Sequence, residues 1–232
     1  MTCRNRAIGI RCLVAGCAVY AGVFGLPVLG RLTLGAQRAA FAFADTMATG
    51  SVREMETEAG NVIADAVREA GGADIALVPA AAFKPEASAP RPATVEQAAG
   101  LLEVPADEVV VLSLRGAQVL AALERSVSFA PQPSAGFLQV SGVKFSYNPS
   151  KPGGQRIGAA TLLSGAPLEA ARTYKVATTR PLANGQQGYF QIWERDQITG
   201  GTGKSLKDAL TERAARKALS SGIEGRITRA GK

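Results

Sequence analysis

The run from Gly200 to Ser205, Gly-Gly-Thr-Gly-Lys-Ser, has the residue types of a loop that binds phosphate. Such a loop surrounds phosphate groups and magnesium with backbone amides, a lysine and a hydroxyl, and it follows a buried strand. Here Ile198 stands where that loop needs its first glycine, and the preceding residues 194–197 are charged or polar. We therefore expect a flexible turn, with Ser205 as the N-cap of a following helix.

The chain contains no histidine. This excludes Ser-His-Asp and Cys-His nucleophile sites, histidine general bases and most zinc or binuclear metal sites. The acidic residues form no Asp-x-Asp-x-Asp-Gly loop, and Glu54, Glu56 and Glu58 are explained as solvated groups near the first turn of a predicted helix. We expect no catalytic residue, no metal site and no cofactor.

The first 44 of the 232 residues have the composition of a leader, with five arginines, no acid and an apolar run from Cys12 to Gly30. A cleaved secretory signal ending at Ala42-Phe43-Ala44 fits this pattern. An uncleaved membrane anchor and lipidation at Cys17 are the alternatives. We expect an exported protein, periplasmic, secreted or membrane-anchored, that meets a membrane only through this N-terminal segment, followed by one domain over residues 45–232.

Net charge gives little reason to expect a nucleic-acid partner. Of the 26 Lys and Arg, five lie in the leader, which leaves 21 against 19 Asp and Glu, a net charge of about +2 instead of +7. All three cysteines lie in the leader as well, so the domain has no disulfide or thiol chemistry of its own.

Helical periodicity and capping residues mark four segments of the domain, which are Met55 to Ala70, Thr94 to Leu102, Gly116 to Val127 and Ser205 to Leu219. Gly71-Gly72 ends the first of them and Gly222 the last. Pro79 to Pro92 contains four prolines and is predicted to be an irregular loop.

Short apolar runs between turn residues predict strands at 75–78, 108–114, 137–140, 143–147, 157–163 and 174–179, and an edge strand within 223–228. Those after residue 128 have the spacing of antiparallel strands or hairpins. The pattern indicates an α+β fold, a single domain with a mixed sheet and flanking helices.

Four segments carry a more specific pattern, in order along the chain. They are Glu56 to Ala66 (Glu-Thr-Glu-Ala-Gly-Asn-Val-Ile-Ala-Asp-Ala), Gly116 to Val127, Gly136 to Phe145 (Gly-Phe-Leu-Gln-Val-Ser-Gly-Val-Lys-Phe), and Thr173 to Thr178 with the Ala183–Tyr189 loop (Ala-Asn-Gly-Gln-Gln-Gly-Tyr). Together they resemble the C-terminal domain of the 5'-nucleotidase family. The resemblance spans about residues 52–228 and implies the fold of that domain.

In that family this domain holds the nucleoside and helps to position the phosphate. A separate N-terminal metallophosphoesterase domain supplies two metal ions and an Asp-His dyad. We expect the chain to stand alone without that domain, which agrees with its lack of histidine. The resemblance therefore implies an association with nucleotide catabolism but no catalytic activity of this chain alone.

The resemblance places Phe137 where the family has an aromatic ring that stacks on the base, a contact worth roughly 1 to 3 kcal/mol. Pro181 stands where the second ring of that sandwich is found. Gln187 replaces an aspartate in the Ala183–Tyr189 loop, which removes a charge. Half of the base clamp is thus lost.

The family loop Asn-x-Gly-Gly-Ile-Arg matches Pro79 to Lys84. Pro79 replaces the asparagine, Ala81 and Ala82 replace the glycines, and Lys84 keeps the charge of the phosphate-binding arginine but not its bidentate geometry. Arg53 lies near another phosphate-contacting arginine. The candidate binding residues are Phe137, Lys84, Arg53, Asn184, Gly185 and Gln187.

Three hypotheses follow from these residues. The domain binds a nucleotide, a nucleoside or an altered ligand; or its pocket is vestigial and it is an envelope interaction or structural module; or it is the non-catalytic subunit of a separate metallophosphoesterase. The replacements at Pro79, Pro181 and Gln187 motivate the second. Each of the six candidates also has a structural explanation, as a core aromatic, a solvated cation or a turn residue.

Overall fold

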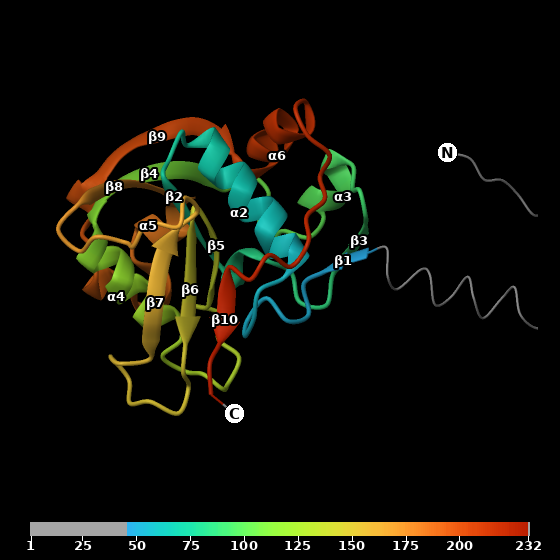
Figure 1. Ribbon diagram of the computed structural model, residues 1–232. Helices are drawn as coiled ribbons and strands as arrows, with labels where there is room; N and C mark the ends of the chain where they lie inside the picture. Colours follow the sequence, from blue (N-terminus) through green and yellow to red (C-terminus); the bar gives the residue numbers. More distant parts are fainter. Residues whose placement is uncertain (1–45, 232) are drawn as a thin grey trace, which may run out of the picture. The chain divides into compact units, whose positions relative to one another are not determined.

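A five-stranded mixed sheet in the order β5-β2-β8-β4-β9 is the centre of the computed structural model, which describes residues 46–231 (Figure 1). Its strands are β2 (Ile75–Pro79), β4 (Glu108–Arg115), β5 (Leu138–Ser141), β8 (Thr173–Thr179) and β9 (Ile198–Ser205). Strands β2 and β8 are parallel, and all other neighbours are antiparallel. The predicted α+β fold with a mixed sheet is confirmed.

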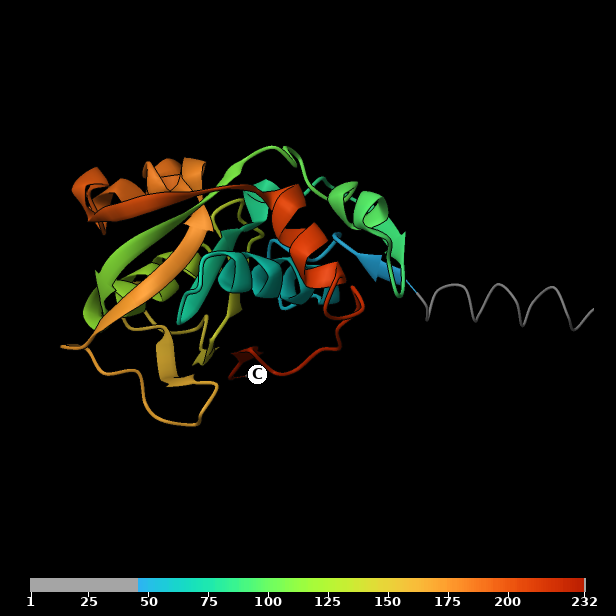
Figure 2. The ribbon, with the colours of Figure 1, turned by 90° about the horizontal axis from the view of Figure 1, so that it is seen from above.

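Helix α2 (Glu58–Ala70) packs on this sheet against β2, β5 and β8, and it also contacts α6 (Leu206–Ala214). Figure 2 shows the two helices side by side. Helix α2 begins three residues later than predicted, because Thr57 has an extended backbone and its hydroxyl accepts a hydrogen bond from the Gly60 amide, which makes it the N-cap. The apolar side of α2 is fully buried, with Val62, Ile63 and Val67 at most 1 % exposed.

The remaining helical segments are α3 (Val95–Ala99), α4 (Gly116–Ser126) and α5 (Arg180–Ala183), with short turns η1 (Ala80–Ala82), η2 (Gln186–Gln191) and η3 (Arg195–Gln197). The predicted capping boxes at Thr94 and Ser205 are both present. Helices α3 and α6 are shorter than predicted. Leu102 pairs with Phe83 and Leu219 pairs with Ala93, so the last residue predicted for each helix forms an isolated bridge with a distant residue.

A second sheet has the order β10-β6-β7 and consists of β6 (Val143–Tyr147), β7 (Ile157–Leu162) and β10 (Ile227–Arg229). Strands β6 and β7 are antiparallel, whereas β10 lies parallel to β6 at the edge of the sheet. An edge strand is therefore present near the C-terminus, but it begins four residues later and ends one residue later than the predicted strand, Ile223 to Thr228. In Figure 1 the three strands lie below the large sheet.

Two segments differ from the sequence predictions. The Gly200–Ser205 run is not a flexible turn, because it belongs to β9 and pairs with β4 through a bulged register, with the Thr202 hydroxyl donating to the Val109 carbonyl at 2.7 Å. Strand β9 lies at the edge of the sheet and pairs with one neighbour only, and glycines are tolerated better in such a strand than in a central one. The Pro79–Pro92 segment, predicted to be irregular, contains η1 and β3 (Ser88–Pro90), which pairs with β1 (Thr46–Ala48).

Residues 46–231 pack as one compact unit. The predicted leader, residues 1–44, lies outside the described residues, so export, anchoring and lipidation stay predictions. Within the described range, no helix combines the length and the apolar character that crossing a membrane requires.

Candidate functional site

A groove of about 260 Å³ lies where the two parallel strands β2 and β8 end. The turn η1 follows β2 directly, and α5 follows β8 directly, so two segments a hundred residues apart meet at one edge of the sheet. Its lining residues are Pro79, Ala81, Ala82, Glu103, Val104, Asp107, Thr179, Pro181 and Gln186. Crevices at the carboxyl ends of parallel strands are the usual ligand sites of open sheets.

Backbone hydrogen bonds fix the first wall of the groove. The amides of Ala80 and Ala81 donate to the carbonyls of Phe137 at 2.7 Å and Ala135 at 2.8 Å, which joins η1 to the start of β5. The Glu103 amide donates to the Ala82 carbonyl at 2.9 Å and brings the segment after α3 to the same place. Prolines and alanines line this wall, so it offers shape and few polar groups.

Thr179, Pro181 and Gln186 line the second wall, and the Ala183–Tyr189 loop that carries Gln186 is attached to the core by several contacts. Gly185 has φ +89°, and a Cβ there would lie 2.6 Å from Phe190 Cβ, so glycine is required. The Arg125 guanidinium donates to the Gln187 carbonyl at 2.6 Å, and the buried Tyr189 hydroxyl donates to the Gly136 carbonyl at 2.8 Å. The loop that carries the predicted site is therefore rigidly attached to the core.

Carboxylates dominate the electrostatics of the groove. Glu103 and Asp107 line it, and no lysine or arginine does among the described residues. Burial raises the pKa of Asp107 above its ordinary value. Two carboxyl groups without a cation repel a phosphate, but they can accept hydrogen bonds from hydroxyl groups.

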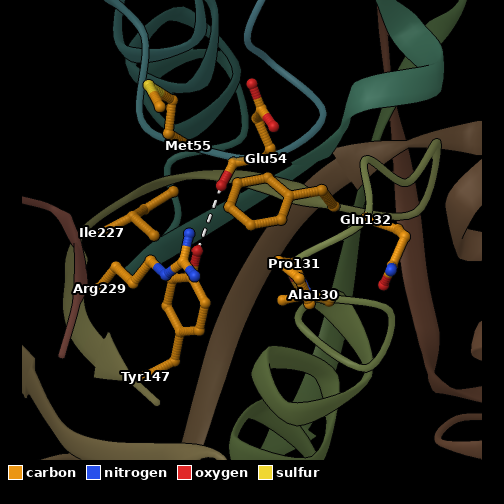
Figure 3. Close-up of a pocket in the computed structure, with 10 residues that line it drawn as sticks. Glu54, Met55, Ala130, Pro131, Gln132, Tyr147, Ile227 and Arg229 are labelled. Carbon is orange, nitrogen blue, oxygen red and sulfur yellow. Dashed lines mark hydrogen bonds between the residues drawn. The ribbon is translucent and has the colours of Figure 1, made fainter. Parts of the chain in front are cut away.

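The structure separates the six predicted binding residues. None of them lines the groove within the described part of the chain; Asn184, Gly185 and Gln187 are neighbours of Gln186, the residue of this loop that does line it. Phe137 is 2 % exposed and lines a different cavity, shown in Figure 3 with Met55, Tyr147 and Arg229.

Lys84 and Arg53 are the two predicted phosphate contacts, and both side chains are exposed. Lys84 is fixed through its backbone, whose amide donates to the Leu101 carbonyl at 2.9 Å, and the Arg53 carbonyl accepts a hydrogen bond from the Ser134 amide. Neither side chain lines the groove or the cavity of Figure 3. Ligand binding by the six residues stays a prediction.

Sequence reasoning missed the groove residues Glu103, Val104, Asp107 and Thr179. The first three lie between α3 and β4 in a segment without helical or strand periodicity, and backbone hydrogen bonds to distant residues, such as that from the Glu103 amide to the Ala82 carbonyl, place them at the groove. Thr179 ends a predicted strand. Both β2 and β8 are predicted as strands. A parallel pairing of the two would place Thr179, at the end of β8, beside the end of β2 and so at the groove.

The Glu56–Ala66 motif serves the fold. The Glu56 carboxylate, 6 % exposed, accepts hydrogen bonds from the Asn61 amide group and from the backbone amides of Glu224 and Arg226, each at 2.7 Å. It therefore holds the C-terminal segment against the start of α2. The predicted interpretation of Glu56 as a solvated helix-start residue is wrong, because its partners lie about 170 residues away.

Asp65 in the same motif is the centre of a buried charge network. It accepts two hydrogen bonds from Arg226, at 2.8 and 3.1 Å, one from Arg213 at 3.0 Å and one from Ser141 at 2.6 Å. Burial alone would raise the pKa of Asp65, but the hydrogen bonds and the charges of the two arginines lower it below its ordinary value. Glu69 also pairs with Arg213.

Gln139, in the Gly136–Phe145 motif, joins β5 to the start of α2. Its side-chain carbonyl accepts from the Thr57 amide at 3.1 Å, and its amide group donates to the carbonyls of Val52 at 3.0 Å and Met55 at 2.7 Å. A Cβ at Gly60 would lie 2.0 Å from Gln139 Oε1. The glycine and the glutamine of the two motifs are thus required by the same contact.

Metal-ligating side chains do not gather in the described structure. Among residues 46–231 no group of three or more His, Cys, Asp or Glu residues is arranged to hold a metal ion.

Comparisons with known proteins point to one family. A family model described as the 5'-nucleotidase C-terminal domain matches residues 35–195. The solved structure of a 5'-nucleotidase precursor from Thermus thermophilus is similar with a TM-score of 0.67 and 25 % identity, over 85 % of this chain and 42 % of that one. The NAD nucleotidase of Haemophilus influenzae has a TM-score of 0.59 and 15 % identity, over 81 % and 37 %.

A putative 5'-nucleotidase from Staphylococcus aureus, solved in complex with alpha-ketoglutarate, has a TM-score of 0.56 and 17 % identity, over 73 % of this chain and 36 % of that one. At such identities the last two structures show the fold alone. No curated protein matches the sequence significantly. The chain spans less than half the length of each of the solved relatives.

Proposed function

The chain belongs to the 5'-nucleotidase C-terminal domain family, as its four motifs predicted, and from this premise we propose that it is a ligand-binding domain that does not hydrolyse phosphate esters by itself. Its ligand is a nucleoside or a similar uncharged molecule with hydroxyl groups. The site is the groove between η1 and the Thr179–Gln186 segment. We further propose that the protein is exported, on the composition of its first 44 residues.

The observation that carries this proposal is the convergence of the two loops at the carboxyl ends of β2 and β8. Ligands of open sheets bind in crevices of this kind. The groove, at about 260 Å³, is close to the lower end of the roughly 300 to 1,000 Å³ of small-molecule sites. A nucleoside, partly exposed to solvent, is compatible with that volume.

The charge of the groove supports an uncharged ligand over a nucleotide. Glu103 and Asp107 are hydrogen-bond acceptors for sugar hydroxyls, whereas a phosphate placed between them meets like charge. The predicted phosphate contacts Lys84 and Arg53 do not line the groove. Recognition therefore rests on the carboxylates and on the shape given by Pro79 and Pro181.

The non-catalytic part of the proposal rests on the residues of the chain. With no histidine in the sequence, neither a histidine base nor a histidine metal ligand is available. The solved relatives are more than twice as long as the part that this chain matches. We propose that hydrolysis at the groove needs catalytic groups that the residues of this chain do not supply, and that a metallophosphoesterase provides them.

Calorimetric titration of the full chain with adenosine and with AMP tests the site. We expect adenosine to bind more tightly than AMP, and the double variant Glu103→Gln/Asp107→Asn to weaken adenosine and to strengthen AMP. Glu169→Gln removes one exposed carboxylate outside the groove and is the matched control, expected to change neither affinity.

Three results would contradict parts of the proposal. Tighter binding of AMP than of adenosine would remove the argument from charge, and absence of saturable binding by adenosine, AMP and UDP-sugars would favour the vestigial pocket of an interaction module. Phosphatase activity of the chain with added divalent metals would overturn the non-catalytic part, whatever the titrations give. Capture of a metallophosphoesterase by the tagged chain would support the partner.

A further inference from the structure

The cavity of Figure 3 is separate from the groove and shares no lining residue with it. It has a volume of about 130 Å³ and lies between the start of the α2 region, the loop after α4, and strands β6 and β10. Its lining residues are Glu54, Met55, Ser126, Ala130, Pro131, Gln132, Phe137, Tyr147, Ile227 and Arg229. Ser126 and Phe137 belong to two of the four motifs, and the other lining residues lie outside them.

Most of the cavity wall is apolar. Phe137 and Tyr147 are 2 % and 4 % exposed, and Ile227 and Met55 add aliphatic surface. The Tyr147 hydroxyl is already used, because it donates to the Glu54 carbonyl at 3.2 Å, the dashed line in Figure 3. Burial raises the pKa of this hydroxyl, so it stays protonated and keeps that role.

Arg229 is the one cationic residue of the lining within the described part of the chain. Its side chain is exposed, and among residues 46–231 no carboxylate forms an ion pair with it. The Glu54 side chain extends away from Arg229 and Tyr147 in Figure 3, and it forms no ion pair with Arg229, although the charges of both residues act on the Tyr147 hydroxyl. An unpaired guanidinium beside an apolar cavity is complementary to an apolar ligand that carries an anionic group.

The volume limits the size of the apolar part. An engineered protein cavity of about 150 Å³ binds benzene, so about 130 Å³ accommodates one six-membered ring. Aromatic walls favour an aromatic ring in offset or edge-to-face contact. The polar group of such a ligand would lie at the mouth, where Arg229 can donate two parallel hydrogen bonds to a carboxylate.

We propose that this cavity is a second binding site, for a monocyclic aromatic carboxylate of the size of benzoate. The ring lies between Phe137, Tyr147 and Ile227, and the carboxylate pairs with Arg229. The site does not depend on the nucleoside groove. Saturation of one site should therefore leave the affinity of the other unchanged.

Saturation-transfer NMR titrations of the full chain with benzoate and with benzyl alcohol, its uncharged analogue of similar size, test the proposal. We expect Arg229→Gln to raise the Kd for benzoate about tenfold, because a charge-assisted hydrogen bond is lost. The Kd for benzyl alcohol should be unchanged. Arg229→Lys keeps the positive charge but not the planar guanidinium. Its Kd for benzoate should lie between that of the native chain and that of Arg229→Gln.

Arg195→Gln is the control, because it removes an exposed arginine that does not line the cavity. Three results would overturn the proposal: no saturable benzoate binding, an equal effect of Arg195→Gln and Arg229→Gln, or displacement of benzoate by adenosine. Failure of the adenosine titration alone would leave this site untouched, since the two sites share no residue.

Discussion

Asp65→Asn is expected to be the most informative change for the fold. Asp65 accepts four hydrogen bonds in the native state, three of them from Arg213 and Arg226, whose side chains are 7 % and 3 % exposed. Removal of one partner of a buried ion pair costs about 3 to 5 kcal/mol, because the other charge stays buried. Arg213 keeps Glu69 and Arg226 keeps Glu224, so we expect a cost near the lower end of that range, about 3 kcal/mol.

Urea unfolding followed by the fluorescence of Trp193, the single tryptophan, measures this change. Trp193 is buried and stacks on Tyr189 with ring centroids 5.1 Å apart, so its signal reports on the packed core. Glu169→Gln, an exposed carboxylate, is the control and should leave the unfolding midpoint unchanged.

The pH dependence of the same experiment gives an independent readout. The folded-state pKa of Asp65 lies below its unfolded value of about 3.9, so its stabilisation is fully present above that value and is lost as the pH falls through the lower, folded value. The difference in unfolding free energy between the native chain and Asp65→Asn should be constant from about pH 7 to 5 and shrink below about pH 4. A difference under about 1 kcal/mol at neutral pH, or parallel pH curves, would refute the reasoning.

Three further substitutions test local contacts by the same urea titration. Gly60→Ala should destabilise by about 1 to 3 kcal/mol through overlap with Gln139 Oε1, and the double variant Gly60→Ala/Gln139→Ala should not add the two single costs; simple additivity would contradict this. Thr57→Ala should cost about 1 kcal/mol as the loss of an N-cap, whereas Thr57→Ser should cost less. Gly185→Ala should cost about 1 to 3 kcal/mol, because the left-handed backbone and the nearby Phe190 both oppose a Cβ; an unchanged midpoint would show that the loop can adapt.

The elements of the fold were predictable where local chemistry decides them. The capping boxes at Thr94 and Ser205, the strand β6 and the edge strand near the C-terminus follow from spacing and turn residues alone, and the structure contains each. The errors have a common cause. Each wrongly predicted segment pairs with a distant part of the chain: Leu102 with Phe83, Leu219 with Ala93, and Gly200–Ser205 with β4. Local periodicity gives no information about such distant partners.

The candidate site was predictable in its location but less so in its residues. The resemblance points to the η1 turn and the Ala183–Tyr189 loop, and the groove is lined by Ala81 and Ala82 from the first and by Gln186 from the second. It could not give Glu103 and Asp107, because backbone contacts with Ala82 and with Leu206, both distant in sequence, place the segment that carries them at the groove. It also could not show that the Phe137 ring faces the other cavity, since the direction of a strand-start side chain depends on packing.

The contacts of Glu56 and Asp65 with Arg226 join the beginning of the domain to its last strand, across 170 and 161 positions of sequence. During synthesis the motif that starts α2 leaves the ribosome long before Arg226 does. Until then Glu56 has only Asn61 as a partner, and Asp65 has Ser141 and Arg213 but lacks its two hydrogen bonds from Arg226, so the docking of α2 on the sheet is incomplete. The native state is therefore closed by its final residues, and a nascent chain stopped before Gly222 should remain open to proteases.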